Sequence, residues 1–188
     1  MKPSIAAVLA VAVLVVAGCS SSDDTGSSST QKHNDADVAF ATEMTPHHAQ
    51  ALVMVDMTEG RDVDPAFADL TAAIKAAQAP EIDLMGGWLE SWGEEVPEGT
   101  GLHHMDGASM GDMANAMSEE DFAQLDEVND RGFEAMWLRM MIAHHEGAID
   151  MGEAEVEDGR YPPALDLAEH IVSSQRAEIE TMRAMLEQ

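Results

Sequence analysis

Residues 141–151 read Met-Ile-Ala-His-His-Glu-Gly-Ala-Ile-Asp-Met, and residues 44–54 read Met-Thr-Pro-His-His-Ala-Gln-Ala-Leu-Val-Met. The two stretches are 97 positions apart, and the match continues without a gap over residues 37–90 and 134–187. Fifteen of these 54 aligned pairs are identical, and many of them are polar or sulfur-containing residues. The chain therefore contains an internal duplication, and we expect the two copies to fold alike.

The first copy has the pattern of a helical hairpin. Its first helix is predicted over residues 36–59, because Gly60 is a good residue to end a helix. Asp64 and Pro65 then supply an N-cap and an N1 proline for a second helix that reaches about residue 91. Pro46 lies inside the first helix and should kink it or delay its start, whereas its counterpart in the second copy is Ala143.

The second copy predicts another hairpin. Ser118, followed by Asp121, is a good start for a helix that continues to residue 158, and Pro162 opens a last helix that runs to the C-terminus. No stretch shows the strict alternation of a half-buried strand. The predicted fold class is all-α, a four-helix bundle over residues 36–188 made of two duplicated helical hairpins.

The N-terminal residues have the pattern of a processing signal. Lys2 supplies a positive charge, residues 5–16 are apolar, and small residues precede Cys19. A dozen apolar residues are too few to span a bilayer comfortably, so residues 1–18 are predicted to be a lipoprotein signal peptide and Cys19 the lipidated residue. The alternative is an ordinary secretory signal with an incidental cysteine. Residues 19–35 hold no large apolar side chain and are predicted to be a flexible tether.

The charge balance excludes several kinds of partner. There are 36 Asp and Glu against 9 Lys and Arg, giving a net charge of −27. Nucleic acids and anionic lipid surfaces need clustered positive charge, so we expect no nucleic-acid binding and a membrane contact only through the lipid anchor. The protein should therefore be exported and anchored on the extracytoplasmic face of the cell membrane. The acidity would favour a metal cation nearby, although solubility explains most of these carboxylates equally well.

The duplicated residues fall on one face of each predicted helix. At about 100° per residue, Met44, His47, His48 and Met54 lie within about a third of the circumference. The second copy repeats this face. The inner faces of the other two helices carry Gln78, Glu81, Ile82 and Met85 in the first copy and Gln175, Glu178, Ile179 and Met182 in the second. The residues proposed to bind a metal ion are His47, His48, His144, His145, Met44, Met54, Met141, Met151, Glu81 and Glu178.

Packing alone is the alternative explanation, since a methionine stripe is usually core and an inward histidine usually has a hydrogen-bond partner. Burying four imidazoles is nevertheless costly unless each is satisfied, and a metal ion satisfies them directly. Imidazole and thioether ligands suit copper, and Cu(I) in particular. The chain contains no Glu-x-x-His motif of the kind used by di-iron bundles. Copper is the predicted ion, while zinc, iron and manganese remain open.

The connector over residues 98–118 holds a second group of soft ligands in a Gly/Ala/Asp context with no apolar helical stripe. Such a cluster is a candidate for secondary capture or exchange of metal in an oxidising compartment. The alternative is a disordered linker with incidental methionines. The residues concerned are His103, His104, Met105, Met110, Met113 and Met117.

These motifs resemble a known family, "domain of unknown function 305". The resemblance lies in His47-His48, in the Met-Ile-x-His-His-x-x-Ala-x-x-Met string within residues 140–151, in Trp88-Leu89 with Trp92, and in Gln175 with Glu178. It implies a ferritin-like four-helix bundle in exported proteins, some of them copper-binding and linked to copper tolerance. The first copy departs from this pattern at Thr45-Pro46, so the equivalence of the two sites is open.

The resulting hypothesis is a cell-envelope lipoprotein that binds copper or another soft metal ion for sequestration, tolerance or transfer to a partner protein. Glu81 and Glu178 would orient imidazoles or bind the ion directly. We expect a binding protein rather than an enzyme, with no catalytic residues. Two alternatives stay open: a ferritin-like metalloenzyme, either an oxidase or a hydrolase, that uses the His/Glu core, and a structural or interaction bundle without metal.

Overall fold

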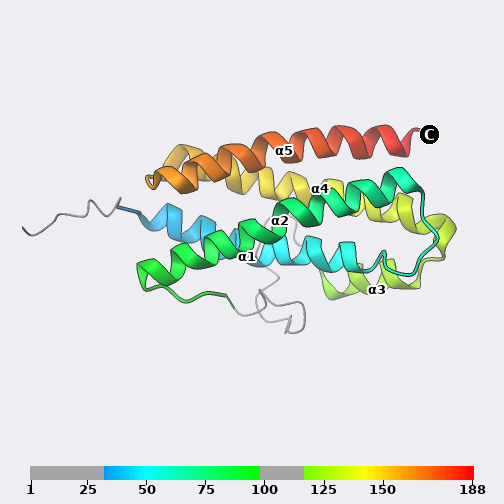
Figure 1. The fold of residues 1–188 in the computed structure, drawn as a ribbon, viewed down its shortest axis with the longest axis horizontal. Coiled ribbons are helices and arrows are strands. Elements are labelled where there is room, and N and C mark those ends of the chain that lie inside the picture. Colours follow the sequence, from blue (N-terminus) through cyan, green and yellow to red (C-terminus); the bar gives the residue numbers. More distant parts are fainter. Residues whose placement is uncertain (1–31, 98–116) are drawn as a thin grey trace, which may run out of the picture. The chain divides into compact units, whose positions relative to one another are not determined.

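The computed structural model describes residues 32–97 and 117–188, and these residues are helical with no strand among them (Figure 1). The predicted signal peptide, Cys19 and most of the predicted tether therefore lie outside the described residues. In the described part, no helix combines the length and apolarity needed to cross a bilayer. The helices are α1 (Asp35–Asp56), α2 (Pro65–Trp92), α3 (Glu119–Glu127), α4 (Asp130–Asp158) and α5 (Pro162–Leu186).

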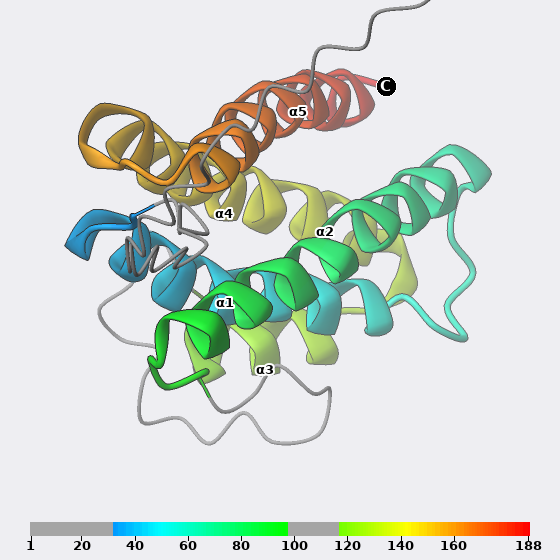
Figure 2. The same ribbon diagram turned by 60° about the vertical axis from the view of Figure 1, so that its left-hand side comes forward.

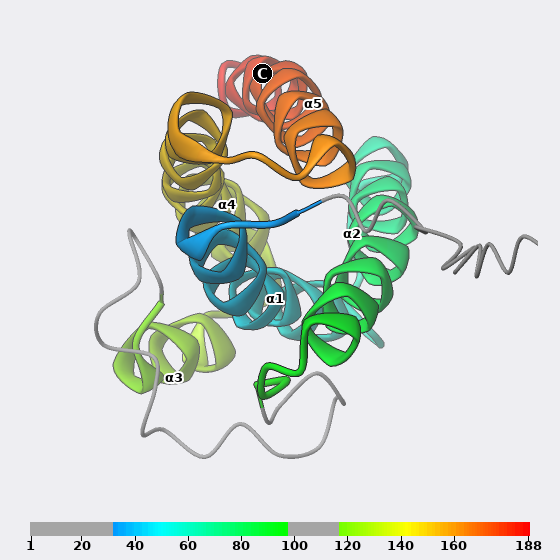
Figure 3. The same ribbon diagram turned by 90° about the vertical axis from the view of Figure 1, so that its left-hand side faces the viewer.

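The four long helices form two antiparallel hairpins that pack side by side. Helix α1 packs on α2 and α4 packs on α5, while α1 and α4 form the contact between the hairpins (Figures 1 and 2). The view down the bundle shows α1 and α4 adjacent, with α2 beside α1 and α5 beside α4 (Figure 3). This arrangement confirms the predicted all-α bundle of two duplicated hairpins.

The helix ends follow the local signals in the sequence. Asn34 and Asp37 form a capping box at the start of α1, and Ser118 and Asp121 form one at the start of α3. Asp64 caps α2, with a proline in its first turn. Gly60 and Gly93 take positive φ values of 77° and 80° where the chain leaves α1 and α2, a conformation that glycine adopts without a Cβ penalty.

One predicted helix is wrong in its extent. The helix expected from residue 118 to 158 is broken into α3 and α4, because Val128 and Asn129 are extended with ψ angles of 132° and 158°. Arg61, from the turn between α1 and α2, donates hydrogen bonds to the carbonyls of Asp126 (3.2 Å) and Val128 (3.0 Å). A side chain 65 residues away in sequence thus satisfies carbonyls that the break exposes.

Helix α1 runs from Asp35 through Pro46, so the proline does not delay its start. Helix α2 contains a second internal proline, Pro80. Both prolines belong to the first copy, and alanines take their places at positions 143 and 177 in the second.

The apolar core divides into two main clusters toward opposite ends of the bundle. One is built around Phe67, Phe133 and Trp137, and the other around Phe40 and Trp88. Equivalent methionines of the two copies lie in different clusters. Met44, Met85 and Met151 belong to the second cluster, and their counterparts Met141, Met182 and Met54 belong to the first.

Candidate metal centre

Four buried histidines lie where α1 and α4 pack against each other. His47, His48 and His145 are 0% exposed and His144 is 1% exposed. The rings of His47 and His144 stack across the interface, with centroids 3.7 Å apart and planes 26° from parallel. The ring centroids of His144 and His145 are 6.4 Å apart. The two pairs therefore turn inward and meet.

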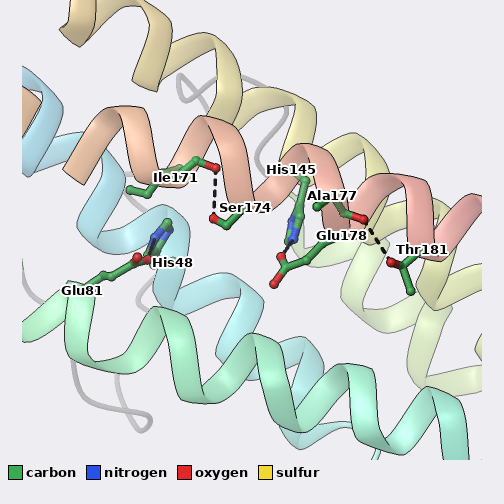
Figure 4. Close-up of polar contacts among 8 residues, drawn as sticks. All are labelled: His48, Glu81, His145, Ile171, Ser174, Ala177, Glu178 and Thr181. Atoms are coloured by element: carbon green, nitrogen blue, oxygen red, sulfur yellow. Dashed lines mark hydrogen bonds and ion pairs between the residues drawn. The ribbon is translucent and has the colours of Figure 1, made fainter. Parts of the chain in front are cut away.

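The outer imidazole of each pair is held by a glutamate from the other helix of its own hairpin. His48 Nε2 is 2.8 Å from Glu81 Oε2, and His145 Nε2 is 2.7 Å from Glu178 Oε2 (Figure 4). A carboxylate can only accept here, so Nε2 carries the hydrogen and Nδ1 of the neutral ring carries the lone pair. Both Nδ1 atoms are buried and have no hydrogen-bond partner among the described residues.

Burial favours the neutral form of the two histidines on α4. Burial lowers the pKa of His144 well below its ordinary value, and charges on His47, His145 and His48 would lower it further. Burial also lowers the pKa of His145, although the hydrogen bond and negative charge of Glu178 act in the opposite direction. Neutral imidazole is the form that offers a lone pair to a metal ion.

Two buried carboxamides share the interior with the histidines. Gln78 on α2 and Gln175 on α5 are counterparts in the two copies, and each precedes the site glutamate of its helix by three residues. Gln78 Oε1 and Nε2 and Gln175 Oε1 are buried and have no hydrogen-bond partner in the described part of the chain. Sequence reasoning placed these residues on the inner face but did not assign them to the site.

The predicted methionine ligands lie on both sides of the histidines along the helix axis. Met44, Met54 and Met141 are fully buried, and Met151 is half-buried against the core. Ten residues of helix span about 15 Å, so Met44 and Met54 cannot contact one ion together. Met44 and Met141 are the thioethers one helical turn from the histidine pairs. Angular position alone does not give this axial separation. Met85 and Met182, which the sequence placed on the inner faces but not among the ligands, are also fully buried.

Histidines and carboxylates alone do not make a closed metal cage in this structure. Within residues 32–97 and 117–188, no three or more His, Cys, Asp or Glu side chains are grouped so that they could hold a metal ion. Any ion bound among the four histidines would therefore depend on two imidazole nitrogens together with thioether sulfur, or on a small movement of the rings.

The predicted capture segment is mostly outside the described residues, including His103, His104, Met105, Met110 and Met113. Met117 is described, and it is only 5% exposed and packs in the core. Its backbone N–H donates to Gln50 Oε1 (3.1 Å), and its carbonyl accepts from Gln50 Nε2 (3.3 Å). The structure thus places Met117 in the core, whereas the sequence had suggested an exposed ligand.

The chain matches the family model described as Domain of unknown function (DUF305) over residues 37–186. It belongs to the DUF305 family. A DUF305 fragment from Deinococcus radiodurans superimposes with a TM-score of 0.70 and 30% identity, covering 82% of this chain and 97% of that one. A DUF305 protein from Streptomyces coelicolor, inferred to be secreted, superimposes with a TM-score of 0.71 and 27% identity over 81% and 92% of the two chains.

A third similar structure is that of CopM in its Cu(I)-bound form, with a TM-score of 0.65 and 27% identity. The match covers 80% of this chain and 95% of CopM. CopM has also been solved in Cu(II)-bound and Ag-bound forms. No protein with a curated description matches this chain in sequence.

Proposed function

We propose that this protein binds a monovalent copper ion among His47, His48, His144 and His145. The observation that carries the proposal is the state of the outer imidazoles. Nε2 of His48 and of His145 is tied to a carboxylate, while the Nδ1 lone pair is buried without a hydrogen-bond partner in the described residues. Each ring is therefore oriented with one nitrogen available inside the core.

A buried polar atom without a partner costs about 1–3 kcal/mol, and the arrangement occurs in both copies. A cation bound to these nitrogens would remove that cost, because a metal ion accepts the lone pair directly. The burial of His144 and His145, which lowers the pKa of both rings, supports the same conclusion. The free-energy cost of these buried nitrogens is thus consistent with a site in which a bound ion takes up their lone pairs.

The donor atoms favour a soft ion. Imidazole nitrogen and thioether sulfur are the available donors, and such a set selects Cu(I) over hard divalent ions. Met44 and Met141 would be the nearest thioether ligands, and Glu81 and Glu178 would fix the ring tautomers, as carboxylates do beside many metal-bound histidines. Cu(I)-bound and Ag-bound CopM, with the same fold, support this choice of ion.

The cellular role in this proposal is sequestration of copper or its transfer outside the cytoplasm. Cys19 would anchor the protein to the membrane through lipid, and residues 19–35 would tether the bundle to the anchor. The segment 98–118, with its histidines and methionines, would capture ions before they reach the core. A family member inferred to be secreted supports an extracytoplasmic location.

The test is a titration of the full chain with Ag(I), a redox-inert probe for the Cu(I) site, followed by Cu(I) under reducing conditions. We expect the double variant His48→Gln/His145→Gln to lose at least about 100-fold in affinity, because both oriented imidazoles are removed. His170→Gln is the matched control, since His170 is exposed on α5 and should leave the affinity unchanged. Millimolar affinity of the unaltered protein for both ions would reject the proposal.

A further inference from the structure

The outer histidines are closed off from solvent, but the two carboxylates that hold them are not. The side chains of His48 and His145 are 0% exposed, whereas those of Glu81 and Glu178 are 11% and 20% exposed. An ion that reaches the buried nitrogens must cross the surface of the bundle somewhere. The two glutamates mark a place where polar groups in contact with the imidazoles are already open to solvent.

The other sides of this polar layer are closed by packed side chains. On the outer side of α1 and α2, Leu52 and Ile82 are 7% and 4% exposed and belong to one apolar cluster. Their counterparts on α4 and α5, Ile149 and Ile179, are 9% and 4% exposed and also lie in the core. The contact between α1 and α4 is occupied by the stacked imidazoles, and the two aromatic clusters fill the ends of the bundle. The side formed by α2 and α5 is left.

Helices α2 and α5 are not closely packed against each other. Helix α1 packs on α2, α4 packs on α5, and α1 packs on α4, but no comparable packing joins α2 to α5 in the described part of the chain. The view down the bundle shows α2 and α5 on the side away from the contact between α1 and α4 (Figure 3). The glutamate carboxylates lie between these two helices (Figure 4).

The neighbours of the glutamates on this side are exposed in both copies. On α2, Leu84 lies about 60° around the helix from Glu81, on the opposite side of it from Ile82. Because Ile82 packs against α1, Leu84 lies on the edge of α2 that faces α5. Its counterpart Thr181 has the same relation to Glu178 on α5. Leu84 is 46% exposed and Thr181 is also exposed, so neither side chain covers the carboxylates with a packed layer.

The charge on this side favours a cation. Among the described residues, Glu81 and Glu178 pair with histidines and not with lysine or arginine. Carboxylates without a basic partner keep a negative potential, which attracts an approaching cation and increases its rate of association.

We propose that the metal ion enters and leaves the polar layer between α2 and α5, past Glu81 and Glu178. This inference rests on the proposed function. Each carboxylate offers an arriving cation an oxygen contact close to the surface, and the imidazole that it holds is the next donor inward. The glutamates thus serve the ion during entry as well as orienting the rings.

The experiment changes the charge beside the glutamates without altering a ligand. Leu84→Lys/Thr181→Lys adds two positive charges on the proposed entry side. Val156→Lys/Ser173→Lys is the matched control, because it adds the same charge at exposed positions on the outer surface of α4 and α5. Each full-length variant is mixed rapidly with silver nitrate and a dye that reports free Ag(I), which gives the association rate constant. We expect the first pair to slow uptake at least about fivefold and the control to slow it by less than about twofold, because repulsion weakens with distance.

The opposite charge separates repulsion from a disturbance of packing. Leu84→Glu/Thr181→Glu should speed Ag(I) uptake, whereas a packing defect would slow it with either charge. High ionic strength should reduce both differences through screening. The inference is overturned if the two lysine pairs change the rate by the same factor or not at all, or if the glutamate pair also slows uptake. Failure of the unaltered chain to bind Ag(I) would instead reject the proposed function itself.

Discussion

The two copies of the hairpin agree in their inward-facing polar residues and differ at positions around them. Both place a histidine pair, a glutamate, a glutamine and buried methionines toward the centre of the bundle. They differ at Pro46 and Pro80, which are alanines in the second copy, and at Thr58, whose counterpart is Glu155. The duplication has thus kept the polar layer while the surrounding helices diverged.

A contact at the ends of the hairpins is present in both copies, but only one copy adds a second carboxyl group to it. Asp37 accepts a hydrogen bond from the backbone N–H of Tyr161 (2.8 Å), and its counterpart Glu134 accepts one from Asp64 (2.7 Å). These are equivalent contacts between the copies. At the Asp37 end a second buried carboxyl, that of Glu155, interacts electrostatically with Asp37. Thr58, at the equivalent position, bonds instead to the Val55 carbonyl.

The paired carboxyl groups titrate very differently. Burial, followed by the hydrogen bond and negative charge of Asp37, raises the pKa of Glu155 to about 8. Burial would raise the pKa of Asp37 as well, but hydrogen bonds from the Tyr161 backbone and from Glu155 hold it below its usual value. At neutral pH Glu155 is therefore protonated and Asp37 is ionised.

The largest expected effect concerns this end of the molecule. Between pH 4.5 and about 8 the folded protein binds a proton at Glu155 that the unfolded chain releases, so the free energy of unfolding should fall as pH rises through this window. Glu155→Gln should reduce the change in the free energy of unfolding between pH 5 and pH 8 by roughly 3 kcal/mol. Chemical denaturation at pH 5, 6.5 and 8 measures it, with the exposed Glu157→Gln as control. If the free energy of unfolding of Glu155→Gln still falls with pH as in the unaltered protein, Glu155 does not distinguish the Asp37 end from the Glu134 end.

The second effect tests whether the two halves of the polar layer are equivalent. Glu81→Gln and Glu178→Gln each weaken the carboxylate contact to one outer histidine. Each should lower the Ag(I) affinity by roughly tenfold, because the imidazole loses its orienting acceptor. Titration of the two single variants and the double variant compares the halves directly. A loss confined to one variant would mean that only one copy holds the ion.

The smallest effect concerns the prolines of the first copy. Pro80 is exposed inside α2 and cannot donate a backbone hydrogen bond, whereas Ala177 can. Pro80→Ala should raise the free energy of unfolding by about 1 kcal/mol, through one regained hydrogen bond. Urea denaturation gives the value, and Ala79→Gly on the same helix should move stability in the opposite direction. A decrease in the stability of Pro80→Ala would show that α2 needs the proline.

The sequence was sufficient for the helices and for the inner faces, because caps, glycines and helical periodicity are local signals. It could not predict the break between α3 and α4, which depends on hydrogen bonds from Arg61 in a distant turn. Periodicity also gives the direction of a side chain but not its level along the bundle. For that reason the stacking of His47 on His144, and the separation of Met44 from Met54, became clear only in three dimensions.

The contacts at the start of α1 determine where a mechanical load would enter the bundle. Asn34 Nδ2 donates to the Asp158 carbonyl (2.8 Å), and Asp37 accepts from the backbone of Arg160 and Tyr161. A pull on the chain at residue 32 is therefore shared at once with the turn between α4 and α5. Tension would first load these hydrogen bonds at the start of α1, and it would reach the histidines farther along the same contact between the hairpins only after they broke.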